Sequence, residues 1–176
     1  MCIRDSSIAN RGTNTLTNSG TITTSGSSSH GIYSYGNNGT ETITNSGTIT
    51  TSGSSSRGIS SYGNNGTETI TNSGTITTSG QYGYGIFVSS NTGTTTITNS
   101  GTIKVTGSDA VGVKFKGGVT LNNSGTISAT GDATYAIFSN GTNNDTLNLS
   151  SGSNITGSID LGAGTADTVN ITGVNG

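Results

Sequence analysis

Branched apolar residues recur in three columns along the chain, separated by Thr, Ser, Asn and Gly. The first column consists of Leu16, Ile43, Ile70, Ile97, Leu121, Leu147 and Val169. The second consists of Ile22, Ile49, Ile76, Ile103, Ile127 and Ile155. The third consists of Ile8, Ile32, Ile59, Ile86, Val113, Ile137 and Ile159. Such recurrence predicts a solenoid, in which each unit buries its few apolar side chains against its neighbours.

Each column lies in a short segment in which apolar residues alternate with Thr, as in Thr40–Asn45 (TETITN). Alternation with a period of two and β-branched residues predicts a strand with one buried face. Asn-Ser-Gly and Gly-Asn-Asn-Gly separate these segments and favour turns. Each coil should therefore hold three short strands, paired in parallel with the next coil about 4.8 Å away. The sequence predicts an all-β fold, a parallel β-helix with coils of 22–27 residues.

Two successive units of 27 residues are almost identical. Thr13–Gly39 and Thr40–Gly66 differ only at Asn14/Glu41, Leu16/Ile43, His30/Arg57 and Tyr33/Ser60. Later spacings in the first column are 24, 26 and 22 residues, so the turns vary in length while the columns stay apolar. Near-identity between coils argues against a unique catalytic pocket, because a pocket needs residues that differ from coil to coil. We therefore expect no enzyme activity and no catalytic residue.

The residue two places after each core position of the second and third columns should also face inward. After the second column these residues are Thr24, Thr51, Thr78, Val105 and Ala129, and after the third they are Ser34, Ser61, Val88 and Phe115. The interior should thus become more apolar toward the C-terminal half. The asparagines that end the first segment of each coil should form a ladder of amide hydrogen bonds, which stabilises stacked strands. These are Asn18, Asn45, Asn72, Asn99 and Asn123, although simple turn formers would give the same pattern.

The composition alone would be typical of a disordered segment, with 8% charged residues, 27% hydrophobic residues and 30 glycines. The repeats overturn that interpretation because the apolar residues are not scattered. A formal net charge of −2 with no run of Lys or Arg excludes a nucleic-acid partner. The single cysteine, Cys2, excludes an internal disulfide framework and a Cys-based metal site. We expect no metal and no cofactor.

Three features could carry chemistry, but each has a simpler interpretation. Glu41 and Glu68 occupy equivalent positions and should lie one strand spacing apart, as in a polysaccharide-cleaving β-helix with paired carboxylates. Duplication of the repeat explains the same pair. His30, the only histidine, follows a Ser-rich loop and should be solvated. Leu161–Val169 (LGAGTADTV) is faintly similar to a calcium-binding nonapeptide, but it occurs once and with different spacing.

Outward-facing threonines form paired columns along two of the expected sheets. Beside the first apolar column they are Thr15/Thr17, Thr42/Thr44, Thr69/Thr71 and Thr96/Thr98. Beside the second they are Thr21/Thr23, Thr48/Thr50 and Thr75/Thr77. Two-wide Thr arrays are the pattern of ice-binding β-helices, so ice binding is an alternative function. The arrays are interrupted at Lys104, Asn122 and Ser128, and Thr is common at exposed strand positions.

Aromatic residues gather around the third segment of each coil and the loop before it. The candidate binding surface consists of Tyr33, Tyr35, Tyr62, Tyr82, Tyr84 and Phe87. Tyr beside Gly and Ser gives a surface that can stack on sugars or hold a protein. The expected partners are host glycans, matrix proteins or other copies of this chain. The alternative is that some of these rings only cover the edge of the coil.

The motif Asn-Ser-Gly-Thr-Ile resembles the passenger repeats of bacterial autotransporters. It occurs at Asn18–Ile22, Asn45–Ile49, Asn72–Ile76, Asn99–Ile103 and Asn123–Ile127, and Asn144–Thr172 is similar to passenger coils as well. The resemblance implies a right-handed β-helix that is exported from a Gram-negative cell and displayed at the cell surface or released outside it. It also implies an adhesin-like stalk without catalysis, attached to the membrane only through a C-terminal translocator barrel.

We divide the chain into two parts. Residues 1–6 (MCIRDS) fit no repeat and are interpreted as a non-native remnant, whereas residues 7–176 are expected to form a single β-helix domain. The absence of a secretory signal and a translocator leads us to expect a fragment of a longer passenger. The sequence thus favours a binding rod over the ice-binding and polysaccharide-cleaving alternatives.

Overall fold

Three parallel sheets make up the computed structural model, which describes residues 3–4, 12–36, 38–89, 92–132 and 135–173. Sheet 1 contains β2 (Thr13–Asn18), β5 (Thr40–Asn45), β8 (Thr67–Asn72), β11 (Thr94–Asn99), β14 (Val119–Asn123), β17 (Thr146–Leu149) and β20 (Thr168–Ile171). Sheet 2 contains β3 (Thr21–Thr24), β6 (Thr48–Thr51), β9 (Thr75–Thr78), β12 (Thr102–Val105), β15 (Thr126–Ala129) and β18 (Asn154–Thr156). Sheet 3 contains β1 (Ile3–Arg4), β4 (Ile32–Tyr35), β7 (Arg57–Tyr62), β10 (Tyr84–Ser89), β13 (Val111–Phe115), β16 (Tyr135–Ser139) and β19 (Ser158–Asp160).

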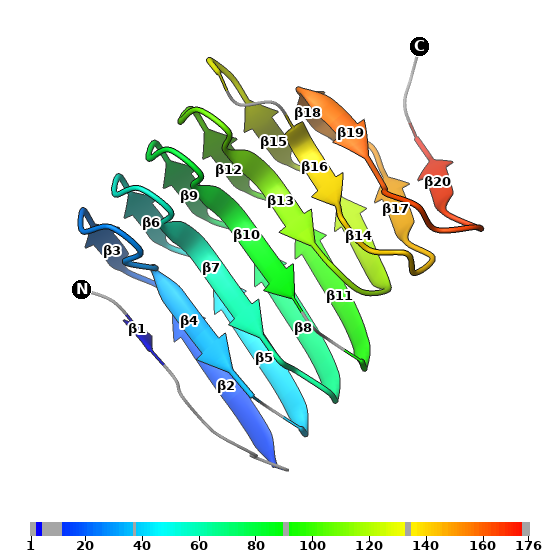
Figure 1. The fold of residues 1–176 in the computed structure, drawn as a ribbon, viewed down its shortest axis with the longest axis horizontal. Coiled ribbons are helices and arrows are strands. Elements are labelled where there is room, and N and C mark those ends of the chain that lie inside the picture. Colours follow the sequence, from blue (N-terminus) through cyan, green and yellow to red (C-terminus); the bar gives the residue numbers. More distant parts are fainter. Residues whose placement is uncertain (1–2, 5–11, 37, 90–91, 133–134, 174–176) are drawn as a thin grey trace.

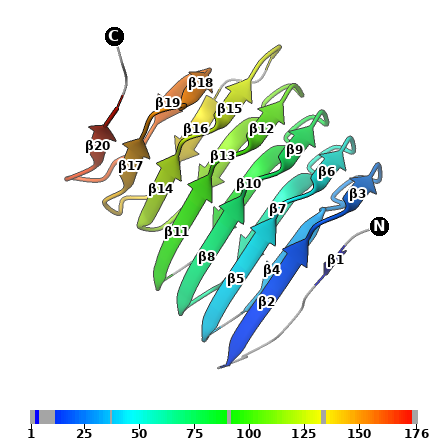
Figure 2. The ribbon, with the colours of Figure 1, turned by 180° about the vertical axis from the view of Figure 1, so that it is seen from behind.

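Each coil passes through sheets 1, 2 and 3 in turn and then returns to sheet 1 one strand farther along the axis (Figure 1). At the front of Figure 1 the strands of sheet 3 point toward the lower right, and at the front of Figure 2 the strands of sheet 1 point toward the upper right. The chain therefore descends at the front of Figure 1 and rises at the back while it advances from the N-terminal coils at the left to the right, which makes the helix right-handed. The parallel β-helix with three short strands per coil is therefore confirmed. Among the described residues no helix is long and apolar enough to cross a membrane.

The strand register reproduces the predicted columns. Each member of the first column pairs with the next, from Leu16 to Val169. The second column pairs in the same way from Ile22 to Ile155. The third column begins differently, because the residue that pairs with Ile32 is Ile3 of β1 and not Ile8, as we expected. Ile8 lies outside the described residues, and sheet 3 includes part of the segment that we had set aside.

The interior is filled by these columns and by the residues two places after them. The inward residues that we predicted are all buried: Thr24, Thr51, Thr78, Val105, Ala129, Ser34, Ser61, Val88 and Phe115. In the first coils these positions are polar, and the hydroxyls of Thr51 and Thr78 have no hydrogen-bond partner among the described residues. In the later coils they are apolar and join the hydrophobic core.

The five asparagines at the ends of the sheet 1 strands form a continuous hydrogen-bonded ladder. Each Nδ2 donates to the next Oδ1 at 2.8 Å, along Asn18, Asn45, Asn72, Asn99 and Asn123. The Nδ2 of Asn123, the last member of the ladder, donates to the Oγ of Ser153 at 2.6 Å. Every Nδ2 also donates to the carbonyl of the glycine two residues later, so one side chain links coils and holds its own turn. Each such bond contributes about 1 kcal/mol.

The Asn-Ser-Gly turns need glycine because successive coils approach too closely there for a side chain. A Cβ added to Gly74 would collide with the carbonyl oxygen of Gly47, and one added to Gly101 would collide with that of Gly74. Glycine therefore allows the turns to stack as tightly as the strands that they join.

Candidate functional site

The outer side of sheet 3 carries most of the aromatic residues of the chain together with the cations Arg57 and Lys114. One row of residues in register consists of Arg4, Tyr33, Ser60, Phe87, Lys114, Phe138 and Asp160. A second row, three residues earlier in each coil, consists of His30, Arg57, Tyr84, Val111 and Tyr135. We name as the aromatic-cationic stripe the residues His30, Tyr33, Arg57, Tyr62, Tyr84, Phe87, Lys114, Tyr135 and Phe138.

A small inward-facing residue near the start of the strands β4 to β16 creates the second row: Gly31, Gly58, Gly85, Gly112 and Ala136. A Cβ added to Gly58 would collide with the Cγ2 of Ile76, so this position faces the core. Because Ile59 is buried as well, two consecutive positions face inward and the strict alternation is broken. Arg57 consequently lies outside, where its guanidinium contacts Ser60, although alternation counted back from Ile59 would place it inside.

The rings of the stripe contact one another within coils and between coils. Within a coil the pairs three residues apart are His30–Tyr33 at 5.5 Å, Tyr84–Phe87 at 5.5 Å and Tyr135–Phe138 at 4.8 Å between centroids. Between coils the pairs are Tyr33–Tyr62 at 6.2 Å and Tyr62–Phe87 at 5.1 Å. These separations lie in the range of roughly 4.5–7 Å in which aromatic pairs attract. The rings from β4 to β10 therefore form one connected surface.

Arg57 is held at the centre of this surface. Its Cζ lies 3.9 Å from the ring centroid of Phe87, 5.2 Å from that of Tyr62 and 5.4 Å from that of Tyr84. Its Nη1 donates to the hydroxyl of Tyr62 at 2.6 Å and to Ser60 Oγ at 3.1 Å. Cation–π contacts of this kind contribute about 0.5–2 kcal/mol. The guanidinium is therefore fixed in place before any partner binds.

Lys114 extends the stripe toward the C-terminal coils. Its Nζ lies 4.7 Å from the ring centroid of Tyr84 and 5.3 Å from that of Phe138, and it donates to the hydroxyl of Tyr84 at 3.2 Å. Tyr84 thus contacts both cations. Within the described part of the chain, no ion pair joins Arg57 or Lys114 to a carboxylate. The positive charge of the stripe is therefore not neutralised by the acidic residues described.

The structure divides the six predicted surface residues into three groups. Tyr33, Tyr62 and Tyr84 are half-buried members of the stripe. Phe87 is only 8% exposed, so our interpretation of it as an exposed contact was wrong, because Arg57 and its aromatic neighbours cover the ring. Tyr35 is 46% exposed and pairs with Tyr62 at the edge of the stripe. Tyr82 is 48% exposed in the turn before β10, at a φ of 55°.

Sequence reasoning did not include Arg57 and Lys114 in the surface, and it predicted a solvated His30. In the structure His30 is half-buried, its Nδ1 accepts the Arg57 backbone N–H at 3.2 Å, and its ring stacks on Tyr33. A signal was available, since two of the four differences between the near-identical repeats are His30/Arg57 and Tyr33/Ser60. These positions are contacting pairs on the outer face of sheet 3.

Glu41 and Glu68 pair in register, as their equivalent positions predicted. Their side chains face inward, however, and are 1% and 0% exposed, because each lies two places before a core Ile. Asn64 Nδ2 donates to Glu41 Oε2 at 3.1 Å, and the Thr95 hydroxyl donates to Glu68 Oε2 at 3.3 Å. Buried carboxyl groups cannot reach a polymer outside the solenoid, so this geometry gives no support to polysaccharide cleavage.

A third buried carboxyl group is Asp145, which is 1% exposed in the turn before β17. Burial raises its pKa above the usual 3.8, the hydrogen bond from the Val119 N–H opposes this, and the neighbouring Asp167 adds to it. Asp167 Oδ1 accepts the Asp145 N–H at 2.8 Å, and Asp160 Oδ1 accepts the Gly162 N–H at 2.9 Å. The carboxylate of Asp167, in the calcium-like segment, and that of Asp160, just before it, thus accept hydrogen bonds from the backbone. Among the described residues no three His, Cys, Asp or Glu side chains gather to hold a metal ion.

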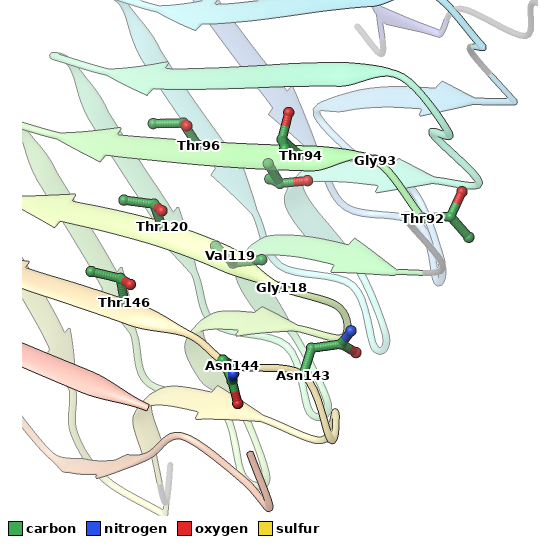
Figure 3. A pocket seen from close by; sticks show the side chains of 11 residues that line it. Thr92, Gly93, Thr94, Thr96, Gly118, Val119, Thr120, Asn143, Asn144 and Thr146 are labelled. Atoms are coloured by element: carbon green, nitrogen blue, oxygen red, sulfur yellow. The ribbon is translucent and has the colours of Figure 1, made fainter. Parts of the chain in front are cut away.

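A hollow of about 720 Å³ lies at the corner between sheets 3 and 1, where coil length changes (Figure 3). The turn after β13 has only three residues, whereas the turn after β16 spans six. Gly118 and Val119 of the short turn and β14 lie between Thr94 on one side and Asn143 and Asn144 on the other (Figure 3). All lining residues are Thr, Gly, Val or Asn, so the hollow presents hydroxyl and amide groups but no general acid or base.

One column of threonine crosses every strand of sheet 1 on its outer side. It consists of Thr15, Thr42, Thr69, Thr96, Thr120, Thr146 and Thr168. Figure 3 shows three of these side chains, on β11, β14 and β17, pointing the same way. The neighbouring column changes from Thr98 to Asn122, as the sequence indicated, but this column has no interruption.

A family model described as the BigA third pectate lyase-like domain matches residues 6–156. The matched segment contains every strand that contributes to the aromatic-cationic stripe. No curated protein and no solved structure matches the chain. The match covers most of the sequence and agrees with the β-helix described above. The chain belongs to the family of the BigA third pectate lyase-like domain.

Proposed function

We propose that this chain is part of a non-catalytic, adhesin-like rod at a bacterial cell surface and that it binds its partner through the aromatic-cationic stripe. The observation that carries the proposal is the stripe itself. Rings and cations from five successive strands of sheet 3, β4 to β16, lie on one outer face and contact one another. Such rings, half-buried and held by their neighbours, bind with little loss of side-chain freedom.

The solenoid supports the mechanical part of this role. Backbone hydrogen bonds and the asparagine ladder run along the axis, so each coil is tied to the next over the whole length. Binding groups repeat at the strand spacing of about 4.8 Å, which allows several weak contacts with one extended partner. A rigid rod with many weak contacts needs no enclosed pocket.

Two observations support export and surface display. The chain belongs to the BigA-type family, and its Asn-Ser-Gly-Thr-Ile motif resembles the passenger repeats of autotransporters. We therefore propose that the rod is a passenger segment displayed on, or released from, a Gram-negative cell. Antibodies against the purified chain should label intact cells that express the complete gene, and labelling only after the cells are broken open would contradict surface display.

The binding role is tested with the immobilised chain and a panel of glycans, matrix proteins and soluble chain. Tyr84→Ser removes the ring that contacts both cations, and it should weaken binding at least about tenfold, as expected for a central aromatic contact. The matched control is Tyr82→Ser, because Tyr82 is exposed in a turn outside the stripe. No binding to any member of the panel, or equal losses in both variants, would contradict a binding rod that uses the stripe.

Ice binding remains a second candidate because of the unbroken threonine column of sheet 1. Its hydroxyl and methyl groups repeat at about 4.8 Å along the axis, which gives a regular array. The candidate predicts thermal hysteresis that Thr69→Tyr abolishes, whereas Thr75→Tyr, on sheet 2, preserves it. Absence of thermal hysteresis in the unmodified chain would eliminate this candidate.

A further inference from the structure

We infer that the ligand of the aromatic-cationic stripe is an acidic polysaccharide, one that carries carboxylate or sulfate groups on an extended sugar chain. This inference rests on the proposed binding function and specifies its partner. It is carried by the combination of unpaired cations, aromatic rings and their spacing along the solenoid axis.

The charge of the stripe favours a partner of opposite sign. The chain has a formal net charge of −2, yet Arg57 and Lys114 lie together with rings and without an ion pair among the described residues. Three of the eight acidic residues, Glu41, Glu68 and Asp145, are buried inside the solenoid. The charges left on the stripe are therefore positive over the strands β7 to β13. Charge-assisted hydrogen bonds to carboxylate or sulfate would neutralise them.

The order of groups along the axis fits a sugar polymer. Arg57 lies on β7, Tyr84 on β10 and Lys114 on β13, so the strands that carry the two cations are two strand spacings apart, or roughly 9.6 Å along the axis. Both charged groups lie beside the Tyr84 ring, at 5.4 Å and 4.7 Å from its centroid. A polymer laid along the axis would place one sugar on the central ring and its acidic substituents near the cations on either side. Half-buried tyrosines provide the apolar face on which a sugar ring stacks and a hydroxyl at the rim.

The geometry favours this partner over a nucleic acid. Nucleic-acid sites use many cations because the phosphates follow one another closely along each strand. The stripe offers only two cations, Arg57 and Lys114, grouped around the Tyr84 ring, which matches a polymer with one acidic group per few sugars better than a polyphosphate. The hydrogen bonds from Arg57 Nη1 to Ser60 and Tyr62 also leave fewer guanidinium N–H groups for a partner.

The test measures the affinity of the full chain, by titration calorimetry, for three polymers. Hyaluronan carries carboxylates, dextran sulfate carries sulfates and dextran is neutral with the same backbone as dextran sulfate. We expect binding to at least one acidic polymer, loss of affinity as salt is raised, and no binding to dextran. Preference for hyaluronan or for dextran sulfate would identify the acidic group.

Variants separate a specific site from general charge. Lys114→Met keeps an unbranched apolar side chain and removes the ammonium that lies beside Tyr84, so it should weaken binding about tenfold. Lys104→Met removes the same charge from the exposed outer face of sheet 2, where its register neighbours are Thr77 and Ser128, and should leave affinity unchanged. Arg57→Lys keeps the charge but loses the planar contacts, and it should also weaken binding.

Three results would overturn the inference. Equal affinity for dextran and dextran sulfate, or equal losses in the Lys104 and Lys114 variants, would exclude specific recognition of acid groups. Binding to matrix proteins or to the chain itself, with no binding to any of the three polymers, would refute the inference and leave the adhesin-like function standing. The absence of binding to polymers, matrix proteins and the chain itself would refute both.

Discussion

The coils from β2 to β10 and the coils from β11 to β19 have the same three-sheet fold but different interiors. In the first group, buried positions beside the isoleucine columns hold Glu, Thr and Ser, as at Glu68, Thr78 and Ser61. In the second group several of the corresponding positions hold apolar residues, such as Val105 and Phe115, although Thr95 and Ser139 remain polar. The coil length also changes, from 27 residues to 24 and 26. One fold thus accepts two kinds of core.

The difference indicates which interactions define the coil. Backbone hydrogen bonds between coils, the three apolar columns and the asparagine ladder occur in both groups, so these features are common to the architecture. The remaining inward positions adjust stability. Polar groups are costly there unless they are hydrogen-bonded, whereas apolar groups contribute about 25 cal/mol per Å² of buried surface. The first group should therefore depend on side-chain hydrogen bonds, and the second on close packing.

The largest expected effect is that of Phe115→Ala in the second group of coils. Phe115 is 1% exposed, and loss of its ring should lower the free energy of unfolding by about 3–5 kcal/mol. Chemical denaturation followed by circular dichroism gives this value. Phe138→Ala, on the half-buried outer side of sheet 3, is the control and should cost clearly less. Equal losses would mean that close packing does not dominate the interior of these coils.

In the first group of coils the corresponding test is Asn72→Ala. This change leaves the Nδ2 of Asn45 and the Oδ1 of Asn99 without their ladder partners in a buried site. It should lower the free energy of unfolding by about 2–3 kcal/mol. Asn122, which accepts a hydrogen bond from Asn148 at 2.7 Å on the outer side of sheet 1, is the control. Asn122→Ala should cost less than about 1 kcal/mol because water can replace the lost partner. A small loss at Asn72 would assign these asparagines to turn formation alone.

A milder change would convert part of the polar interior into an apolar one. The Thr78 hydroxyl is buried without a hydrogen-bond partner among the described residues, and Val105 occupies the same column in the next coil. Thr78→Val should therefore stabilise the chain by about 1 kcal/mol. Thr24→Val should do the opposite, because the Thr24 hydroxyl donates to the carbonyl of Ser29 at 2.7 Å. Melting temperatures that shift in the same direction for both variants would contradict this account.

The smallest expected effect is a change in the pH dependence of stability. Because burial raises the pKa of Asp145 above its usual 3.8, folding disfavours the ionised carboxyl group. The contribution of this group is therefore complete below about pH 4 and is lost as the pH rises through the folded-state pKa. Asp145→Asn retains an acceptor for the Val119 N–H and should reduce the loss of stability above about pH 4. Denaturation midpoints measured at several pH values test this, and unchanged curves for the variant would contradict it.

Periodicity made the fold and much of the interior predictable. The columns, the inward Thr and Ser positions and the order of the asparagines all follow from a period of two within strands and a repeat of about one coil. The same rule could have identified Glu41 as buried, since it lies two places before Ile43. The start of the third column was not predictable in this way, because the pairing of Ile3 with Ile32 does not follow the repeat length.

The sequence by itself determined the β-helix, its three columns and the residues of its ladder, because stacked coils impose the same register on every repeat. Only the tertiary structure decided which groups meet on the outside. Gly58 breaks the alternation and brings Arg57 out onto Phe87, the register of β10 and β13 brings Lys114 beside Tyr84, and the hollow at Gly118 lies where the coil length changes. These contacts join residues of different coils, and their distances depend on local bends and turn lengths that a repeating pattern does not specify.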